Sequence, residues 1–139
     1  MIIGYTSGVY DLFHVGHLKL LNKAKSMCDK LIVGVTSDEL MLNYKNKKAV
    51  IPYAERAEIV SNIKAVDLVV PQENMDKLDA WKRLKFNIMF VGDDWYKSPK
   101  WTSIEEKFLE ENIKIIYFPY TKGISSTIIN KTLEDLRNN

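Results

Sequence analysis

Short apolar runs alternate with helical patterns along the whole chain, and this alternation constrains the fold more than any other feature. Several runs are β-branched with no polar alternation, which is typical of strands buried on both faces of a sheet. Strands are predicted at Ile2–Thr6, Lys30–Val35, Leu68–Val70, Ile88–Val91 and Ile113–Phe118. Helices are predicted at His17–Met27, Tyr53–Ala65, Lys77–Lys85, Ser103–Glu111 and Ser125–Arg137. The repeated strand–helix order predicts an α/β fold with an open parallel sheet and helices on both faces.

The size and charge of the chain limit the functions to expect. A length of 139 residues suits a single domain, residues 1–139. Lys and Arg total 20 against 18 for Asp and Glu, so no nucleic-acid or membrane partner is expected. No apolar run approaches the roughly 20 residues that span a bilayer, and Met1–Tyr5 is typical of a strand rather than a signal peptide. The lone Cys28 is expected to be a buried helical thiol, and a reducing cytoplasm fits these features.

The segment His14-Val15-Gly16-His17 lies between the first predicted strand and the first predicted helix. In an open α/β sheet this is where the phosphates of a nucleotide bind, because the helix start offers unpaired amides and partial positive charge. Gly16 has no Cβ and lets a phosphate approach the backbone. Each imidazole adds a donor that can be cationic near an anion. We expect His14 and His17 to act on these phosphates; two purely structural histidines are the alternative.

The strand order 3-2-1-4-5 of a Rossmann-like five-stranded sheet makes strands one and four neighbours at the point where ligands bind. Three segments then converge at the carboxyl ends of strands, namely Gly8–His17, Gly92–Trp95 and Thr121–Thr127. The last contains Gly123 and good helix-capping hydroxyls, which suit a second phosphate site or an ordinary capped helix. Asp93 and Asp94 are candidates for holding Mg²⁺, contacting a base or ribose, or capping a turn. Trp95 either stacks on a ring or packs in the core, whereas Trp81 and Trp101 are expected to pack.

A lysine-rich irregular stretch, Asn43–Ile51, follows the second strand and is called the lysine segment below. A run of lysines usually forms a solvated face. Here the segment follows the end of the second predicted strand and contains Lys45, Lys47 and Lys48. A mobile cationic loop at this place could close over a triphosphate and neutralise charge on a leaving pyrophosphate. Arg56 lies in the first turn of the next helix, where the helix dipole disfavours a cation, and this favours a ligand role.

Several common chemistries lack their residues in this chain. Two histidines and no His-Glu-x-x-His pattern argue against a metal hydrolase. Cys28 has no neighbouring base in the sequence, which argues against a thiol nucleophile. The dinucleotide pattern Gly-x-Gly-x-x-Gly and the P-loop pattern are both absent.

At these residues the chain resembles the nucleotidyltransferase superfamily, whose signature is His-x-Gly-His with a later Ile-Ser-Ser/Thr-Thr segment. Within it the chain is most similar to the cytidylyltransferases, and among them to those that use glycerol 3-phosphate. Residues 8–17 match the family's Gly-Thr-Phe-Asp-Leu-Leu-His-x-Gly-His, and Gly92-Asp93-Asp94-Trp95 is a more specific match. Residues 121–127 match Arg-Thr-Glu-Gly-Ile-Ser-Thr-Thr without its first residue, and the lysine segment through Arg56 matches in spacing.

The resemblance implies transfer of CMP from CTP to a small phosphorylated alcohol, glycerol 3-phosphate first among them, giving CDP-glycerol, a cell-surface polysaccharide precursor, and pyrophosphate. It also implies Mg²⁺ bound with CTP and a cytoplasmic homodimer. The implied catalytic residues are His14, His17, Lys45 and Lys47. The implied nucleotide-binding residues are Gly8, Val9, Tyr10, Asp11, Gly16, Arg56, Gly92, Asp94, Trp95, Thr121, Gly123, Ile124, Ser125, Ser126 and Thr127. The implied acceptor-binding residues are Asp11, Lys64, Tyr120 and Lys122, and no residue is predicted to ligate a metal directly.

Four positions depart from the family pattern. Tyr120 and Lys64 stand where the family has arginine, Lys122 replaces a glutamate, and Val9 replaces a threonine. Neither a tyrosine nor a lysine reproduces the bidentate grip of arginine on a phosphate. The open alternatives are a different acceptor such as phosphoethanolamine or phosphocholine, an adenylyltransferase, and a non-catalytic nucleotide-binding module.

Overall fold

The structure, a computed structural model, describes residues 1–92 and 99–118. The described strands are β1 (Ile3–Gly8), β2 (Lys30–Thr36), β3 (Leu68–Gln72), β4 (Ile88–Gly92) and β5 (Lys114–Phe118). The described helices are α1 (Val15–Lys25), α2 (Asp38–Lys45), α3 (Tyr53–Ser61), α4 (Lys77–Leu84) and α5 (Pro99–Glu110). The predicted final helix, Ser125–Arg137, lies outside the described residues.

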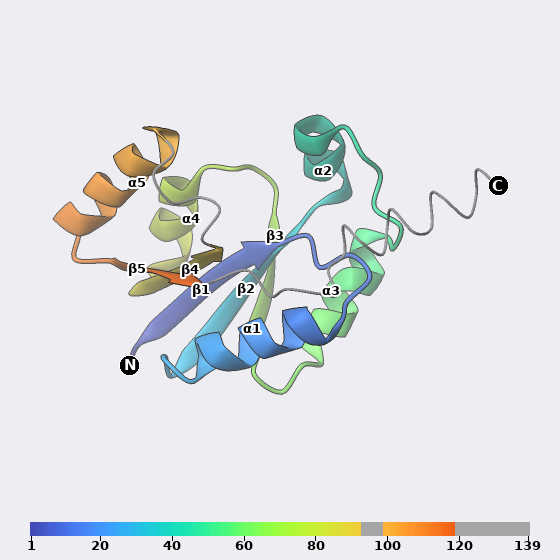
Figure 1. The fold of residues 1–139 in the computed structure, drawn as a ribbon, viewed down its shortest axis with the longest axis horizontal. Coiled ribbons are helices and arrows are strands. Elements are labelled where there is room, and N and C mark those ends of the chain that lie inside the picture. Colours follow the sequence, from blue (N-terminus) through green and yellow to red (C-terminus); the bar gives the residue numbers. More distant parts are fainter. Residues whose placement is uncertain (93–98, 119–139) are drawn as a thin grey trace.

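The strands form one parallel five-stranded sheet in the order β3-β2-β1-β4-β5, which confirms the predicted fold class (Figure 1). β1 is central, since Thr6 pairs with Val33 of β2 on one side and with Phe90 of β4 on the other. Because all strands run the same way, their carboxyl ends share one edge of the sheet, called the carboxyl edge below.

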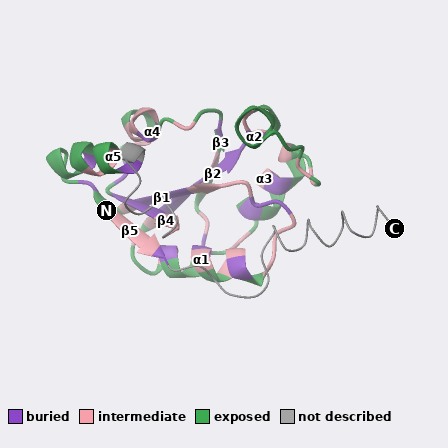
Figure 2. Cartoon of the chain, turned by 45° about the horizontal axis from the view of Figure 1, so that its top comes forward, coloured by how far each residue is buried: buried purple, intermediate pink, exposed green. Residues whose placement is uncertain are grey.

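Two apolar clusters cover the two faces of the sheet. Leu21 and Ala24 of α1 and Val60 of α3 pack on one face, and Ala80 of α4 and Phe108 of α5 pack on the other. Figure 2 shows buried residues concentrated in the central strands, while α2 is largely exposed. Trp101 is buried and Trp81 packs beside it, so both tryptophans have the predicted packing role.

The helix boundaries differ from the predictions at several points. α2 was not predicted, because Met41 is its one buried residue and its apolar pattern is correspondingly weak. Its sequence signal is the cap: the Ser37 hydroxyl accepts the Leu40 amide at 3.1 Å, and two acidic residues follow in the first turn. The first part of the lysine segment is therefore helical rather than irregular. α3 ends at Ser61 rather than at Ala65.

The prediction for Cys28 is met only in part. α1 ends at Lys25, so Cys28 follows the helix instead of lying within it. The thiol is half-buried, contacts the Ala24 carbonyl oxygen at 3.4 Å, and has its pKa raised by burial. In the part of the chain that the structure describes, no helix is long and apolar enough to span a bilayer.

Candidate active site at the carboxyl edge

A strained turn joins the end of β1 to α1. Tyr10 and Leu12 have φ angles of 55° and 51°, in the left-handed region that residues with a Cβ rarely adopt. Each such residue costs about 1–3 kcal/mol and persists only where the surroundings enforce it. Here the Tyr10 ring is buried in the apolar cluster beneath α1, and a Cβ at Gly8 would lie 3.2 Å from that ring. Gly8 and Tyr10, which were predicted to contact a nucleotide, therefore pack against each other and determine the shape of the turn.

The two histidines form the amino-terminal cap of α1. His14 is the N-cap residue, and its Nδ1 accepts the Gly16 amide at 3.0 Å. His17 returns the contact, since its Nδ1 accepts the His14 amide at 3.2 Å. This is a capping box in which imidazoles replace the usual Ser/Thr and Glu/Gln pair. Because both Nδ1 atoms act as acceptors, both neutral rings carry their hydrogen on Nε2 and present it as a donor.

The Nε2 atom of His14 is buried and has no hydrogen-bond partner among the described residues. Leaving a buried donor unmatched costs about 1–3 kcal/mol, so such atoms are rare and mark places where a ligand completes the structure. The imidazole centroids lie 4.0 Å apart. The two rings therefore form a compact pair at a helix start, and an anion suits the unmatched donor.

His17 is a neutral donor in this structure. Burial is the main cause, followed by the adjacent His14, and together they lower its pKa from the usual 6.5 to about 4. With this pKa His17 is uncharged at pH 7 in the structure, and its expected charging next to a bound anion stays a prediction. Its contribution to an anion is a directed N–H donor rather than a full charge.

Gly16 is buried and its amide is already used by His14, so that amide does not bind a phosphate in this arrangement. The close approach of a phosphate to Gly16 that the sequence indicated stays a prediction.

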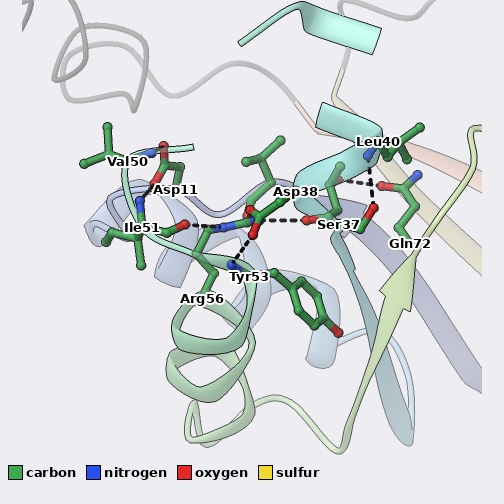
Figure 3. Close-up of polar contacts among 11 residues, drawn as sticks. Asp11, Ser37, Asp38, Leu40, Val50, Ile51, Tyr53, Arg56 and Gln72 are labelled. Atoms are coloured by element: carbon green, nitrogen blue, oxygen red, sulfur yellow. Dashed lines mark hydrogen bonds and ion pairs between the residues drawn. The ribbon is translucent and has the colours of Figure 1, made fainter. Parts of the chain in front are cut away.

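Asp11 is 2% exposed, and its carboxylate faces the lysine segment (Figure 3). Its Oδ2 accepts the Val50 amide and its Oδ1 accepts the Ile51 amide, both at 2.9 Å. The carboxylate oxygens of Asp11 therefore hold backbone amides 39 and 40 residues away, and its expected contact with the nucleotide or the acceptor stays a prediction.

Arg56 is fully buried, and its guanidinium binds the protein itself. Nε donates to the Ile51 carbonyl at 2.8 Å, and Nη1 donates to the carbonyls of Val9 at 2.7 Å and Thr36 at 2.8 Å. Nη2 donates to Asp38 Oδ1 at 2.6 Å. In this structure the guanidinium contacts the protein, and the nucleotide contact expected for Arg56 stays a prediction.

The lysines have exposed side chains at the carboxyl edge. Lys45 lies in the last turn of α2, Asn46 ends that helix in the left-handed conformation, and Lys47 and Lys48 follow. The lysine segment is fixed at both ends, by the Ser37 cap before it and by Asp11 after it. Lys45 and Lys47 are thus placed by a short helix and a tethered turn rather than by a free loop.

Lys64 is not brought to this edge. It lies between the end of α3 and the start of β3, where the Asp67 amide donates to the Leu31 carbonyl near the beginning of β2. β2 separates this region from the carboxyl edge by about 20 Å at roughly 3.3 Å per residue. Within one chain the acceptor role expected for Lys64 is therefore not supported.

Gly92 ends β4 and is half-buried at the carboxyl edge, beside β5. The remaining predicted site residues lie outside the described residues, and these are Asp94, Trp95, Tyr120, Thr121, Lys122, Gly123, Ile124, Ser125, Ser126 and Thr127.

Lys77 was not singled out from the sequence. It is the first residue of α4 and is 9% exposed, and its Nζ donates to Ser7 Oγ at the end of β1 at 3.0 Å. A buried cation at the carboxyl edge is an unusual placement for lysine. The sequence does contain a signal for the position of Lys77: Asp76 is the N-cap residue of α4, so Lys77 begins the helix that follows the third strand.

Among residues 1–92 and 99–118, no group of three or more His, Cys, Asp or Glu side chains could hold a metal ion. The imidazoles present N–H groups rather than lone pairs, so they do not add a ligand. The described residues therefore do not fit a protein-held metal. Mg²⁺ commonly binds through substrate phosphates and water, and such an ion needs no side-chain cage.

The comparison with known families rests on almost the whole chain. Residues 5–132 match the family profile described as cytidylyltransferase-like. The chain belongs to this family. A glycerol-3-phosphate cytidylyltransferase of Bacillus spizizenii is 39% identical over 94% of the chain and 96% of its own length. The enzyme of the same name from Staphylococcus aureus is 36% identical over 92% of each chain.

Solved structures bear out the cytidylyltransferase-like fold. A lipopolysaccharide core biosynthesis protein from Thermoplasma volcanium superposes with a TM-score of 0.72 at 24% identity, covering 89% of this chain and 99% of that one. A pantoate-beta-alanine ligase from Francisella tularensis has a TM-score of 0.65 at 19% identity, covering 93% of this chain and 65% of that one. At these identities the likeness concerns the fold alone.

Proposed function

We propose that this cytidylyltransferase-like protein transfers CMP from CTP to glycerol 3-phosphate, giving CDP-glycerol and pyrophosphate, and that residues 1–139 act as a single domain. The observation that carries the proposal is the paired imidazole cap of α1, which engages both Nδ1 atoms and leaves the Nε2–H of His14 buried and unmatched among the described residues. The choice of CTP and of glycerol 3-phosphate is supported by relatives of that name at 36–39% identity over nearly their whole length.

The chemistry needs no general base. A phosphate monoester has a second pKa of roughly 6, so the acceptor is already ionised at pH 7. An acceptor phosphate oxygen attacks the α-phosphorus of CTP in line, the new P–O bond forms, and the bond to the pyrophosphate oxygen breaks. Both Nδ1 atoms are engaged by amides, which suits histidines that donate hydrogen bonds rather than remove protons. His14 and His17 would hold phosphate oxygens as charge moves toward the leaving group.

Lys45 and Lys47 would neutralise the leaving pyrophosphate from the opposite side. Their support is their exposed placement at the carboxyl edge, on a segment that Asp11 fixes beside the turn leading to the histidines. A cation that stabilises the negative charge of the transition state lowers the activation free energy, whereas a cation that stabilises only the bound substrate does not.

The acceptor contacts that we propose replace Lys64 with a different cation. Lys64 lies near the amino ends of the strands, and Lys77 places a cation at the carboxyl edge beside β1. We propose Lys77 as an acceptor-side cation, together with Tyr120 and Lys122 as acceptor contacts. The family membership also supports Mg²⁺ bound with CTP, a homodimer and a cytoplasmic location, which we propose on that ground alone.

Pyrophosphate release tests this proposal directly. The purified chain is incubated with Mg²⁺ and either CTP or ATP, with and without glycerol 3-phosphate, and products are identified by mass spectrometry. We expect release only when CTP and glycerol 3-phosphate are both present, with CDP-glycerol as the product. Equal release with ATP would favour an adenylyltransferase. Binding of CTP without turnover across a panel including phosphoethanolamine and phosphocholine would favour a nucleotide-binding module, and turnover of one panel member alone would reassign the acceptor.

A further inference from the structure

Three charged residues, Asp11, Asp38 and Arg56, link the segments that meet at the carboxyl edge, and we infer that they form a positioning clamp that sets the lysines against the histidines. The inference rests on the proposed function for its catalytic consequence. The clamp acts on catalysis through the lysine segment and not through a contact of its own with substrate.

Arg56 is the centre of the clamp. Its guanidinium reaches Val9 in the turn after β1, Thr36 at the end of β2 and Ile51 at the end of the lysine segment (Figure 3). These are backbone carbonyls on three separate segments, so one planar fork fixes their relative positions. A side chain that bound a ligand would instead direct these donors outward.

Asp11 supplies the second link between the turn and the lysine segment. It lies between the two left-handed residues Tyr10 and Leu12, and its carboxylate takes the amides of Val50 and Ile51. The turn that leads to the imidazoles is thereby fastened to the segment that carries the lysines. A shift of the lysine segment would have to break both hydrogen bonds together.

Asp38 completes the clamp from α2. It accepts Arg56 Nη2 at 2.6 Å and the Tyr53 amide at 3.0 Å, so it joins the starts of α2 and α3. Partial burial raises the pKa of this carboxyl, but the Tyr53 amide and the Arg56 guanidinium outweigh it and hold the pKa below its usual value. Asp38 is half-exposed, whereas the Arg56 side chain is fully buried. Asp38 is therefore the member that can be changed with least damage to the fold.

The chain contains a matched control at the other edge of the sheet. Asp67 also accepts one backbone amide, from Leu31 at 2.8 Å, and one cation, Lys25. Its side chain is about as exposed as that of Asp38, at 37% against 50%. Asp38→Asn and Asp67→Asn therefore each remove one carboxylate charge that meets a backbone amide and a cation, at opposite ends of the strands. The cation is the fully buried Arg56 in the first case and the partly exposed Lys25 in the second.

The test compares these variants by kinetics well below their melting temperatures. We expect Asp38→Asn to lower kcat for CTP by about 10-fold with a much smaller change in KM, because small misplacements of charge act on the transition state. Asp67→Asn should leave kcat unchanged. In a Lys45→Ala/Lys47→Ala background the effect of Asp38→Asn should fall below about 3-fold, because the lysines through which it acts are gone. An additive effect, or an unchanged kcat in Asp38→Asn, overturns the clamp.

Limited trypsin digestion gives a readout that needs no activity. Cleavage after Lys45, Lys47 and Lys48, located by mass spectrometry, should be faster in Asp38→Asn than in Asp67→Asn or the unmodified chain. Equal cleavage in the two variants overturns the clamp. If the unmodified chain releases no pyrophosphate from CTP, the proposed function fails by itself, and the digestion still decides whether the clamp exists.

Discussion

At the scale of single residues, the two histidines do two things at once. Their Nδ1 atoms cap α1, and this capping fixes which nitrogen of each ring faces a ligand. The spacing His-x-Gly-His indicated a phosphate site from the sequence, but not the tautomers or the neutral state of His17. Those follow from burial and from backbone geometry, which a pattern of residue types does not contain.

Replacing His14 should separate catalysis from stability. His14→Ala loses a cap worth about 0.5–2 kcal/mol but also removes a buried unmatched donor that costs about 1–3 kcal/mol, so the two changes nearly cancel. Turnover should fall by about 10²–10³-fold, as when an oxyanion donor is lost. The measurements are kcat and the melting temperature. Ser37→Ala is the control, since it removes a cap from α2 without a compensating gain and should lower the melting temperature more. Near-normal turnover of His14→Ala would assign the residue to the fold alone.

His17 should make stability depend on pH in a defined window. Its folded pKa of about 4 lies below the usual 6.5, so the unfolded chain binds the proton more readily between these values. The stability that comes from burying neutral imidazole is present above pH 6.5 and is lost as the pH falls toward 4. His17→Gln keeps a capping-box acceptor but does not titrate. Urea unfolding at pH 6.5 and pH 4.5 should show a larger loss for the unmodified chain, and parallel losses would contradict the assignment.

At the scale of elements, the strands were predictable and the polar connections were not. Runs without polar residues such as Leu31–Val35 are buried on both faces of the sheet, and burial of this kind leaves a strong pattern in the sequence. Asp11 holds backbone amides 39 and 40 residues away, and Arg56 reaches backbone carbonyls 20 and 47 residues away, which no local pattern encodes. α2 was missed because its stability comes from its cap and from the clamp rather than from an apolar face.

The lysine segment should contribute to rate and little to stability. Lys47→Ala removes an exposed cationic side chain from the lysine segment, and we expect kcat to fall about 10-fold. The melting temperature should stay nearly unchanged, because exposed groups of this kind contribute little to folding. Lys82→Ala, on the exposed side of α4, is the control. The measurement is kcat of both variants under steady-state conditions. An equal kcat for Lys47→Ala and Lys82→Ala would indicate that Lys47 only belongs to a solvated face.

At the scale of the whole molecule, the strand order follows from a simple rule of connection. Right-handed crossovers place α1 and α3 on one face of the sheet and α4 and α5 on the other (Figure 1). The direction in which successive strands are added reverses between β1 and β4. This part of the architecture was predictable, because the alternation of strands and helices leaves few alternatives. It also explains why the imidazole cap and the end of β4 belong to one site.

Nucleotide binding should stabilise the whole fold. A ligand at 100 times its dissociation constant adds about 2.7 kcal/mol to the free energy of unfolding. CTP with Mg²⁺ should therefore raise the melting temperature by several degrees, and ATP at the same concentration should raise it less. His14→Ala should reduce the shift, because the unmatched Nε2–H donor is removed. Thermal scans with both nucleotides test this, and an equal shift with ATP would contradict the preference for CTP.

β1 is the first strand along the chain, yet in the folded sheet it lies between β2 and β4. Its Thr6 pairs with Phe90, 84 residues later. At synthesis rates of 5–20 residues per second, one side of the nascent strand stays bare for about 4–17 s. A bare strand edge is a template for pairing with other chains. Neighbouring copies on one messenger RNA are therefore exposed to each other during that interval, and slower translation would lengthen it.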